Sequence, residues 1–292
     1  MTDRLTEEFE RHRGQLRAVG YRMLGSFAEA EDAVQEAWLR LNRTDADSIN
    51  NLGGWLTTVT ARVCLDMLRS RTSRREEPLD THVPDPVVTG PDGMDPEQQA
   101  LLADSVGLAL LVVLDTLEPA ERLAFVLHDM FAVPYDDIAP IVDRSPVAAR
   151  QLASRARRRV QGADPDPDPD LNRQRQVVDA FVSASRGGDF EALVAVLDPD
   201  VVLRADVGAT LLGVSHEVRG AAQVAGQAVL FRSRDGGLIT RPVLVNGAVG
   251  LLNSLDGKAV SVLGFTVRGD RITRIHILAD PERLAALDLP AL

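Results

Sequence analysis

Two runs of closely spaced arginines are the residues in this sequence that are best suited to bind an anionic partner. The run 62–75 contains five arginines and one acid, Asp66, and the run from Arg144 to Arg159 contains six arginines and no acid. The whole chain has 32 basic and 43 acidic residues and a formal net charge of −11. A solvated surface usually intersperses both signs, so compact basic runs in an acidic chain indicate directed contacts with an anionic partner. Nucleic acid is the leading candidate.

The second arginine run lies in a pattern typical of two short helices joined by a tight turn. We expect the first helix over 134–142, a turn over Asp143–Ser145 and the second helix over 147–159, with Ser145 as its N-cap. Asp143 stands where glycine is commoner, and aspartate is tolerable there because it can adopt left-handed backbone angles. The spacing therefore predicts a helix-turn-helix.

The second helix of this pair should have one face for packing and one for contacts. Ala139 is expected where the helices cross, and Ala149 and Leu152 would face the first helix. The exposed side could then reach base edges and phosphates in a major groove. It would carry Arg150, Gln151, Ser154 and Arg155. The alternative is a basic surface helix that binds nothing.

Helical periodicity predicts three further helices. Apolar residues fall on one stripe between Ala30 and Leu41, with acidic and polar residues on the opposite side. Another helix should begin near Gly54, after the polar stretch 44–51, and its C-terminal half holds the first arginine run. The segment 101–117 is apolar nearly all round, which indicates a helix buried against its neighbours.

Proline and acidic residues divide the chain, whose length of 292 residues favours two or three domains. Five prolines between Glu76 and Pro96, with no helical periodicity, predict a linker. Alternating Asp and Pro over 164–170 predict an extended spacer. We therefore expect a helical block over 1–76, a linker over 77–97, a second helical block over 98–163, the spacer over 164–170 and a mixed block over 171–292.

Composition excludes several classes of protein. No segment approaches the roughly 20 uninterrupted apolar residues of a membrane helix, and residues 1–15 resemble neither a signal peptide nor a transit peptide. The single cysteine, Cys64, excludes an internal disulfide and fits a reducing compartment, so we expect a buried thiol in a cytoplasmic protein. Because no nucleophile motif, phosphate loop or cluster of metal ligands is visible, we expect no catalytic residues, no metal and no cofactor.

Three sequence runs carry a resemblance to a known family. They are AEDAVQEAWLRL from Ala30, GGWLTTVTARVCLDMLRSRTSR from Gly53, and LEPAERLAFVLHDMFAVPYDDIAPIVDRSPVAARQLASRARRRV from Leu117. In this order they resemble bacterial sigma factors of the extracytoplasmic-function (ECF) group, over the first 160 residues. The resemblance implies two helical domains, called regions two and four. These domains direct the RNA polymerase core to the −10 and −35 elements of promoter DNA.

The resemblance also assigns roles to residues of the first block. In sigma factors the first motif binds a coiled coil of the largest polymerase subunit, and the matching residues are Asp32, Gln35 and Glu36, with Arg40 nearby. The −10 element is melted and read as a single strand, which needs polar edges and cationic contacts. Those are supplied here by Asn50, Asn51, Trp55, Arg62 and Arg69. Trp55 is equally compatible with a place in the core.

The −35 element would be read as duplex DNA by the second helix of the helix-turn-helix. Arg150 and Gln151 are the candidates for base contacts, and Arg155, Arg157 and Arg158 for phosphate contacts. Ser145 and Ser154 complete this set of DNA-binding residues.

The block 171–292 reads as helices followed by an antiparallel sheet, which is α+β. Helices are expected at 171–185 and 190–197, and strands at 201–205, 237–245, 248–252, 258–267 and 271–278. Its sequence resembles the SnoaL-like members of the NTF2-like cone fold. The expected fold is therefore multi-domain: all-α sigma regions two and four, the latter a helix-turn-helix, followed by an α+β NTF2-like, SnoaL-like cone domain.

A group of sigma factors carries such a domain in the same place, and this resemblance implies regulation in cis through the linker. The group's closing motif is similar to Asp280, Pro281, Glu282, Arg283 and Leu284. Its linker motif is matched loosely at His82–Pro86, and a glycine-rich motif partly at Asp235–Gly237. A cone of this kind could also hold a small ligand.

The cone also raises the alternative of an enzyme, because SnoaL-like folds include cyclases and isomerases. An acid or base in a cone interior could come from Asp206, His216, Asp235 or His276, although none makes a recognisable pair. The leading hypothesis is a sigma factor that catalyses nothing itself. The alternatives are a one-component DNA-binding regulator with a ligand-sensing cone, and a cyclase-type enzyme fused to a DNA-binding module.

Overall fold

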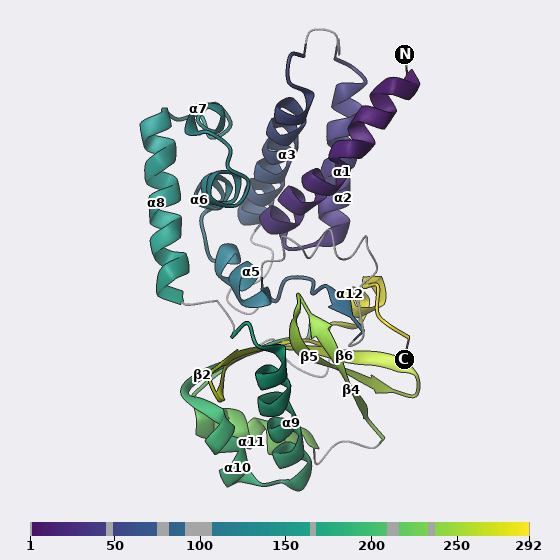
Figure 1. Ribbon diagram of the computed structural model, residues 1–292, viewed down its shortest axis with the longest axis vertical. Coiled ribbons are helices and arrows are strands. Elements are labelled where there is room, and N and C mark those ends of the chain that lie inside the picture. The colour runs from purple at the N-terminus through teal and green to yellow at the C-terminus, as the bar shows by residue number, and fades with distance from the viewer. Residues whose placement is uncertain are drawn as a thin grey trace. The chain divides into compact units, whose positions relative to one another are not determined.

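The computed structural model describes residues 2–44, 49–74, 82–90, 107–163, 168–208, 216–232 and 237–291 (Figure 1). The described residues form two compact units. The first combines the chain up to residue 74 with residues 113–163, and the second combines residues 82–112 with the chain from residue 168 onward. Among the described residues, no helix is both long and apolar enough to cross a lipid bilayer.

Three long helices open the first unit: α1 (Thr2–Leu24), α2 (Phe27–Leu41) and α3 (Leu52–Arg74). The apolar stripe predicted for α2 is confirmed, since Ala30, Ala33, Val34, Ala37 and Leu41 are its buried residues. Val34 and Leu41 pack into a core that includes Phe9, Leu16 and Leu56. The thiol of Cys64 lies buried on α3, as expected, and burial raises its pKa to about 12.

Five further elements follow the linker. They are α5 (Leu108–Asp115), α6 (Pro119–Phe125), the single π-helical turn η2 (Val126–Met130), α7 (Tyr135–Ile138) and α8 (Pro146–Ala163). Of the helix predicted over 101–117, the described part begins at Leu108, and residues 101–106 lie outside the described residues. A buried arginine joins this group to the first three helices: Arg122 donates to the carbonyl of Met23 at 2.8 Å and to Asp115 at 2.7 Å.

The predicted helix-turn-helix is present, with two differences in detail. Asp143 has the left-handed φ of 53°, and the Ser145 hydroxyl accepts from the Ala148 N–H at 3.3 Å. The first helix is shorter than predicted, because helical structure ends at Ile138 and turns follow. Leu152 is half-buried, whereas Ala149, Ala153, Ala156 and Val160 are the buried residues of α8. Small alanine side chains let α8 approach its neighbours more closely than a leucine at the contact would.

The second unit is built on one curved sheet with strand order β1-β4-β5-β6-β7-β2-β3. The strands are β1 (Val88–Thr89), β2 (Leu197–Asp206), β3 (His216–Arg219), β4 (Ile239–Val245), β5 (Ala248–Leu255), β6 (Lys258–Arg268) and β7 (Arg271–Leu278). All neighbours pair antiparallel except β2 and β7, which are parallel. The five predicted strands are confirmed. Strands β1 and β3 were not predicted, and β1 comes from the linker.

Helices α9 (Leu171–Gly187), α10 (Phe190–Val196) and α11 (Ala221–Arg232) gather on one side of this sheet (Figure 1). They bury an apolar core that includes Phe181 and Leu193 from the helices and Leu203, Phe265 and Ile275 from the strands. We call this side of the sheet the helix face and the opposite side the outer face. A last helix, α12 (Pro281–Ala286), begins at Asp280, whose side chain caps the Glu282 N–H at 2.8 Å.

Close packing on the outer face makes Gly250 of β5 intolerant of a side chain. A Cβ atom there would lie 2.6 Å from the Leu263 carbonyl oxygen and 2.4 Å from Val245 Cγ2. We expect Gly250→Ala to lower the free energy of unfolding of the second unit by roughly 1–3 kcal/mol, the range for overpacking. Hydrogen exchange of β5 amides measures the effect. Gly226→Ala on α11 is the matched control, because nothing lies within 4 Å of its Cβ, and it should stabilise the helix by up to about 1 kcal/mol.

Candidate nucleic-acid interface

Helix α2 presents a polar face that no described residue of the first unit covers. Asp32 and Gln35 are exposed, and Glu36 and Arg40 are half-exposed and joined by a 2.8 Å hydrogen bond. Leu39 lies on the same helix and is 41% exposed. Sequence reasoning did not single out Leu39, although a large apolar residue off the buried stripe was the available signal.

The residues predicted to capture a single strand take different positions around α3. Asn50 is exposed, and Asn51 caps the helix through Oδ1, which accepts from the Gly54 N–H at 3.0 Å. Trp55 is half-buried against the core around Phe9 and Leu56, so much of the indole has a packing role. Residues 45–48 of the predicted loop lie outside the described residues.

Two arginines of α3 remain accessible. Arg62 and Arg69 are both exposed and stand seven residues apart, which is about two helical turns and so places them on one side of the helix. Arg62 also donates to the Pro140 carbonyl at 3.4 Å, next to the helix-turn-helix.

The arginines of α8 fall into two groups. Arg155 and Arg159 both hold the buried carboxylate of Glu121, at 2.6 and 3.0 Å, and Arg157 binds Asp129 with its Nε at 2.9 Å. These arginines anchor α8 to the elements behind it. Because the Arg155 and Arg159 side chains are still 48% and 53% exposed, they keep donors for an outside partner.

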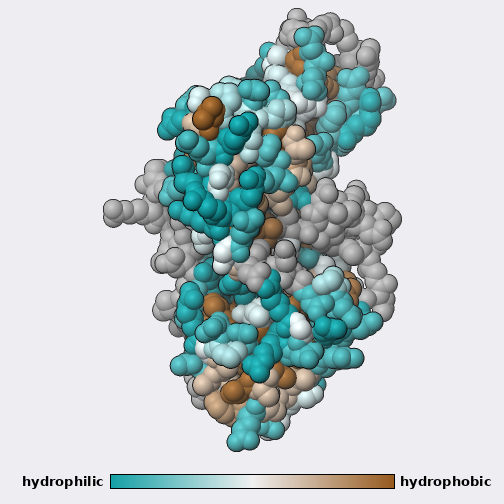
Figure 2. Space-filling view, turned by 60° about the vertical axis from the view of Figure 1, so that its left-hand side comes forward, coloured by the Kyte–Doolittle hydropathy of each residue, from teal (hydrophilic) through white to brown (hydrophobic). Residues whose placement is uncertain are grey.

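The second group faces outward. Arg150, Gln151, Ser154 and Arg158 are exposed, and the Arg150 guanidinium lies 5.3 Å from the centre of the Tyr135 ring. Val147, in the first turn of α8, is 64% exposed and was not predicted. The surface turned forward in Figure 2, which includes α7 and α8, is mostly hydrophilic. A helix with these side chains can offer base contacts at its N-terminal half and phosphate contacts further along.

Comparison with known proteins shows which protein family has this arrangement. The family models for Sigma-70 region 2 and Sigma-70 region 4 match residues 9–74 and 107–160. The ECF RNA polymerase sigma factor SigJ of Mycobacterium tuberculosis is 40% identical, over 97% of this chain and 94% of the relative. This chain belongs to the ECF sigma factors. A probable ECF sigma factor of the same species, SigI, is 36% identical over 98% of the chain and 96% of the relative.

The likeness extends to the whole fold. The crystal structure of SigJ from M. tuberculosis covers 98% of this chain and all of the matched chain, with a TM-score of 0.77 and 36% identity. In this ECF sigma factor the first unit therefore contains the match to region 2 and nearly all of the match to region 4, and the second unit has an α+β layout.

The linker of this sigma factor docks on the outer face of the sheet in the second unit. Arg283 of α12 donates to Asp206 at 2.7 Å, to Asp85 at 2.9 Å and to the Val83 carbonyl at 2.6 Å. Asp206 also accepts from the Val83 N–H at 3.0 Å. Of the residues predicted to meet the linker, Arg283 makes the contact, Asp280 caps its helix and Leu284 is buried, while Pro281 and Glu282 are exposed.

A second clamp holds the linker a few residues further on. The Val87 N–H donates to Asn246 Oδ1 at 3.1 Å, and the Asn246 N–H donates to the Val87 carbonyl at 2.8 Å. Val88 and Thr89 then pair with β4 as strand β1 and are 3% and 2% exposed. A linker predicted from its prolines thus contains a buried edge strand.

Asp206 therefore holds the linker and does not point into a cone interior. Its side chain is buried on the outer face, and burial alone would raise its pKa. Hydrogen bonds from His82 and from the Val83 N–H, together with the charge of Arg283, outweigh burial and hold the pKa of Asp206 at about 2. The Asp206 carboxylate is therefore ionised at physiological pH.

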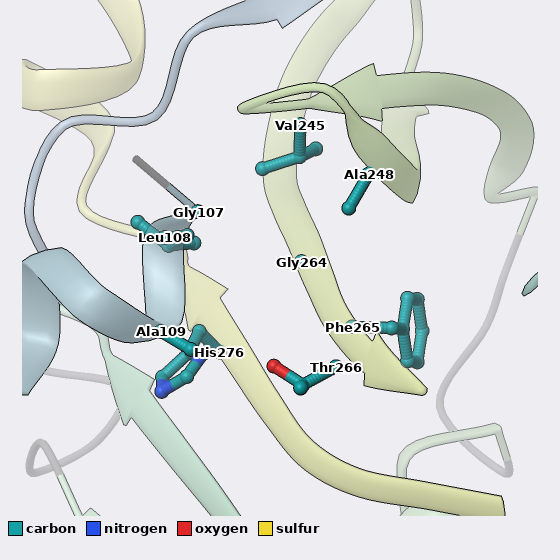
Figure 3. Close-up of a pocket in the computed structure, with 9 residues that line it drawn as sticks. All are labelled: Gly107, Leu108, Ala109, Val245, Ala248, Gly264, Phe265, Thr266 and His276. Carbon is teal, nitrogen blue, oxygen red and sulfur yellow. The ribbon is translucent and has the colours of Figure 1, made fainter. Parts of the chain in front are cut away.

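His276 also lies on the outer face, because its neighbours Ile275 and Ile277 pack in the core under the helices. The start of α5 covers it: Gly107, Leu108 and Ala109 close over Gly264, Thr266 and His276 (Figure 3). The remaining cavity leaves about 10 Å³ for the centre of a water molecule, which is about the minimum for one water. His216 is half-buried on β3, and Asp235 lies outside the described residues.

The cavity is thus too small for a ligand, and His276 is suited to a neutral, structural role. Burial, and then the charges of Arg204 and Arg274, lower the pKa of His276 to about 3. The described part of the chain brings no carboxylate into the lining of this cavity. Neither Asp206 nor His276 supplies an acid or base under the helices, because both side chains lie on the outer face.

The lowered pKa of His276 predicts a pH dependence of stability. Because the unfolded chain takes up this proton near pH 6.5 and the folded chain only near pH 3, the free energy of unfolding should fall with pH below about 6.5. The slope for one proton approaches roughly 1.4 kcal/mol per pH unit. Denaturant unfolding of the second unit between pH 6.5 and pH 5 measures it. His276→Gln should remove this slope and His216→Gln should keep it; equal slopes in both variants would contradict the assignment.

Proposed function

We propose that this ECF sigma factor directs bacterial RNA polymerase to promoters through three exposed surfaces of regions 2 and 4. Helix α2 would bind the polymerase core through Asp32, Gln35, Glu36 and Arg40. Their exposure on one polar face supports this role, since a basic coiled coil is the complementary partner. The exposed Leu39 beside them would supply the apolar contact of such an interface.

Promoter recognition would be divided between α3 and α8. Arg62 and Arg69 would bind the backbone of the melted −10 strand, with Asn50 at its bases, while Asn51 and the half-buried Trp55 shape the site. In the −35 element Arg150 and Gln151 would contact bases. Ser145, Ser154, Arg155, Arg157 and Arg158 would position the backbone, and Val147 could contact a thymine methyl group.

The protein would catalyse nothing itself and would act in the cytoplasm with the polymerase. The 40% identity to an ECF sigma factor supports a non-catalytic role. The second unit would instead regulate the sigma factor in cis. The observation that supports regulation is the ionic contact of Arg283 with Asp85 and Asp206, which holds the segment joining regions 2 and 4.

Run-off transcription with purified bacterial core polymerase and a promoter library tests the proposed function. The full chain should give promoter-dependent transcripts, and Gln35→Ala should reduce them on every promoter because it weakens core binding. Arg150→Ala should reduce them on promoters with a matched −35 element more than on scrambled ones, by roughly 1–3 kcal/mol of binding. Gln15→Ala, an exposed glutamine of α1, is the matched control. Specific duplex binding with no transcript would favour the one-component regulator.

Arg283→Ala tests the linker contact separately. The substitution leaves Asp206 and Asp85 without their guanidinium partner, so the Val83 amide should exchange its hydrogen at least tenfold faster. Arg241→Ala, on β4 of the same unit, is the control and should leave Val83 protected. Unchanged exchange at Val83 would refute the role of Arg283 in docking. Faster exchange with unchanged transcription would refute regulation through the linker.

A further inference from the structure

The arginine proposed to contact bases of the −35 element lies against an aromatic ring. Arg150 is exposed on α8, and its guanidinium carbon lies 5.3 Å from the centre of the Tyr135 ring, at the start of α7. A guanidinium within about 6 Å of a ring centre is attracted to the face of that ring. Within the described part of the chain, this guanidinium forms no hydrogen bond and no ion pair. The Tyr135 ring is therefore the contact that orients it.

The ring of Tyr135 is itself held by the π-helical turn η2. It stacks on the ring of His128, with 3.8 Å between the ring centres and 25° between the ring planes. Nδ1 of His128 lies 3.0 Å from the Val133 carbonyl oxygen. Because a carbonyl oxygen only accepts, Nδ1 carries the proton and donates it, which fixes the orientation of the His128 ring. The half-buried Tyr135 ring thus rests on a side chain that is already anchored.

A second arginine of α8 also contacts Tyr135. Arg157 follows Arg150 by seven residues, about two helical turns, and so lies on the same side of the helix. Its Nε donates to Asp129 at 2.9 Å. The pKa of Arg157 is raised first by the hydrogen bond to Asp129, against the lowering effect of burial, and further by a hydrogen bond with the Tyr135 side chain. Contacts with two arginines and one histidine leave the tyrosine side chain little freedom to rotate.

A guanidinium placed in this way is suited to bind one particular base. Contact with a ring uses the face of the guanidinium and leaves the N–H groups along its edge free, and these form the fork that binds O6 and N7 of guanine in the major groove. Arg150 is the fifth residue of α8, in the part of a recognition helix that contacts base edges. An arginine side chain loses much rotamer freedom when it is fixed, and an orientation formed before binding reduces that cost.

We propose that Tyr135 is a positioning residue for promoter recognition, whose ring holds the Arg150 guanidinium with its edge directed at a guanine of the −35 element. The inference rests on the proposed role of Arg150 in base contact. It adds the base that Arg150 selects and the residue that sets its orientation. In this role Tyr135 acts through Arg150 and contacts no base itself, so its effect on recognition disappears when Arg150 is removed.

Nuclear magnetic resonance of the full chain without DNA tests the contact itself. The side-chain resonances of Arg150 should carry an upfield ring-current shift, and its Nε–H group should show restricted motion. Tyr135→Leu should remove both, whereas Tyr135→Phe, which keeps the ring, should retain both. Phe190→Leu, which removes an exposed ring from α10 of the second unit, is the matched control and should change neither. Arg150 resonances that are unchanged in Tyr135→Leu would overturn the proposal.

Selection of duplexes by the reconstituted holoenzyme, from a library randomised in the −35 element, tests recognition. Arg150→Ala should abolish a guanine preference at one position. Tyr135→Leu should weaken the same preference by about two- to fivefold and leave the other positions unchanged, and Tyr135→Phe should restore it. In the Arg150→Ala background, Tyr135→Leu should have no further effect, because its effect passes through Arg150.

The other outcomes separate this proposal from the proposed function. An equal loss of preference at every position in Tyr135→Leu would indicate a general structural effect and overturn the positioning role, as would a guanine preference that Tyr135→Leu leaves intact. If the wild-type holoenzyme selects a −35 sequence but Arg150→Ala keeps every base preference, the positioning role is overturned and the sigma factor function stands. If the wild-type holoenzyme selects no sequence, the proposed promoter function fails, and the positioning role fails with it.

Discussion

The organisation of the second unit depends on one buried carboxylate, Asp206, at the end of β2. A charge removed from water is costly unless it is paired and hydrogen-bonded. Asp206 is stabilised by Arg283 from the last helix and by the Val83 N–H from the linker. Neither partner belongs to the strand that carries the acid. The C-terminal helix and the linker must therefore meet beside Asp206 for this charge to be paired. The rest of the linker is then held by the pairing of β1 with β4 and by the hydrogen bond to Asn246.

The two faces of the sheet differ because side chains alternate between the faces along each strand. The helix face is filled by an apolar core of valine, leucine, isoleucine and phenylalanine, with Phe181 and Phe265 in edge-to-face contact at 5.7 Å. Polar residues of the strands are therefore turned to the outer face, where the linker and the start of α5 lie. Among the described residues, the helix face is therefore occupied by packed side chains, and the outer face is the side on which the linker binds.

Local patterns were enough to predict the elements that carry recognition. The stripe of α2, the helix-turn-helix with its left-handed Asp143, and the five main strands all follow from periodicity and turn residues near one another in the chain. The sequence motifs of regions 2 and 4 added the roles of those surfaces. What could be read from the sequence was therefore the set of helices and the side chains that they expose.

Contacts between distant residues could not be predicted from such patterns. The proline-rich linker gives no sign that Val88 pairs with Val245, because the pairing depends on a strand more than a hundred residues away. Arg155 and Arg157 look like free phosphate ligands until Glu121 and Asp129 are placed behind them. Asn51 and Trp55 similarly combine a predicted DNA role with capping and packing. In each case the sequence shows the residue type. The fold determines which of its side-chain groups already contact a partner within the protein.

Docking of the linker also limits the length of chain that can extend between regions 2 and 4. In this structure Arg122 keeps regions 2 and 4 in direct contact. A released chain from residue 75 to 107 could extend to roughly 110 Å, whereas residues 75–81 alone reach at most about 25 Å. Binding of residues 82–90 to the second unit therefore shortens the length of chain over which regions 2 and 4 could separate, and their release would restore that length.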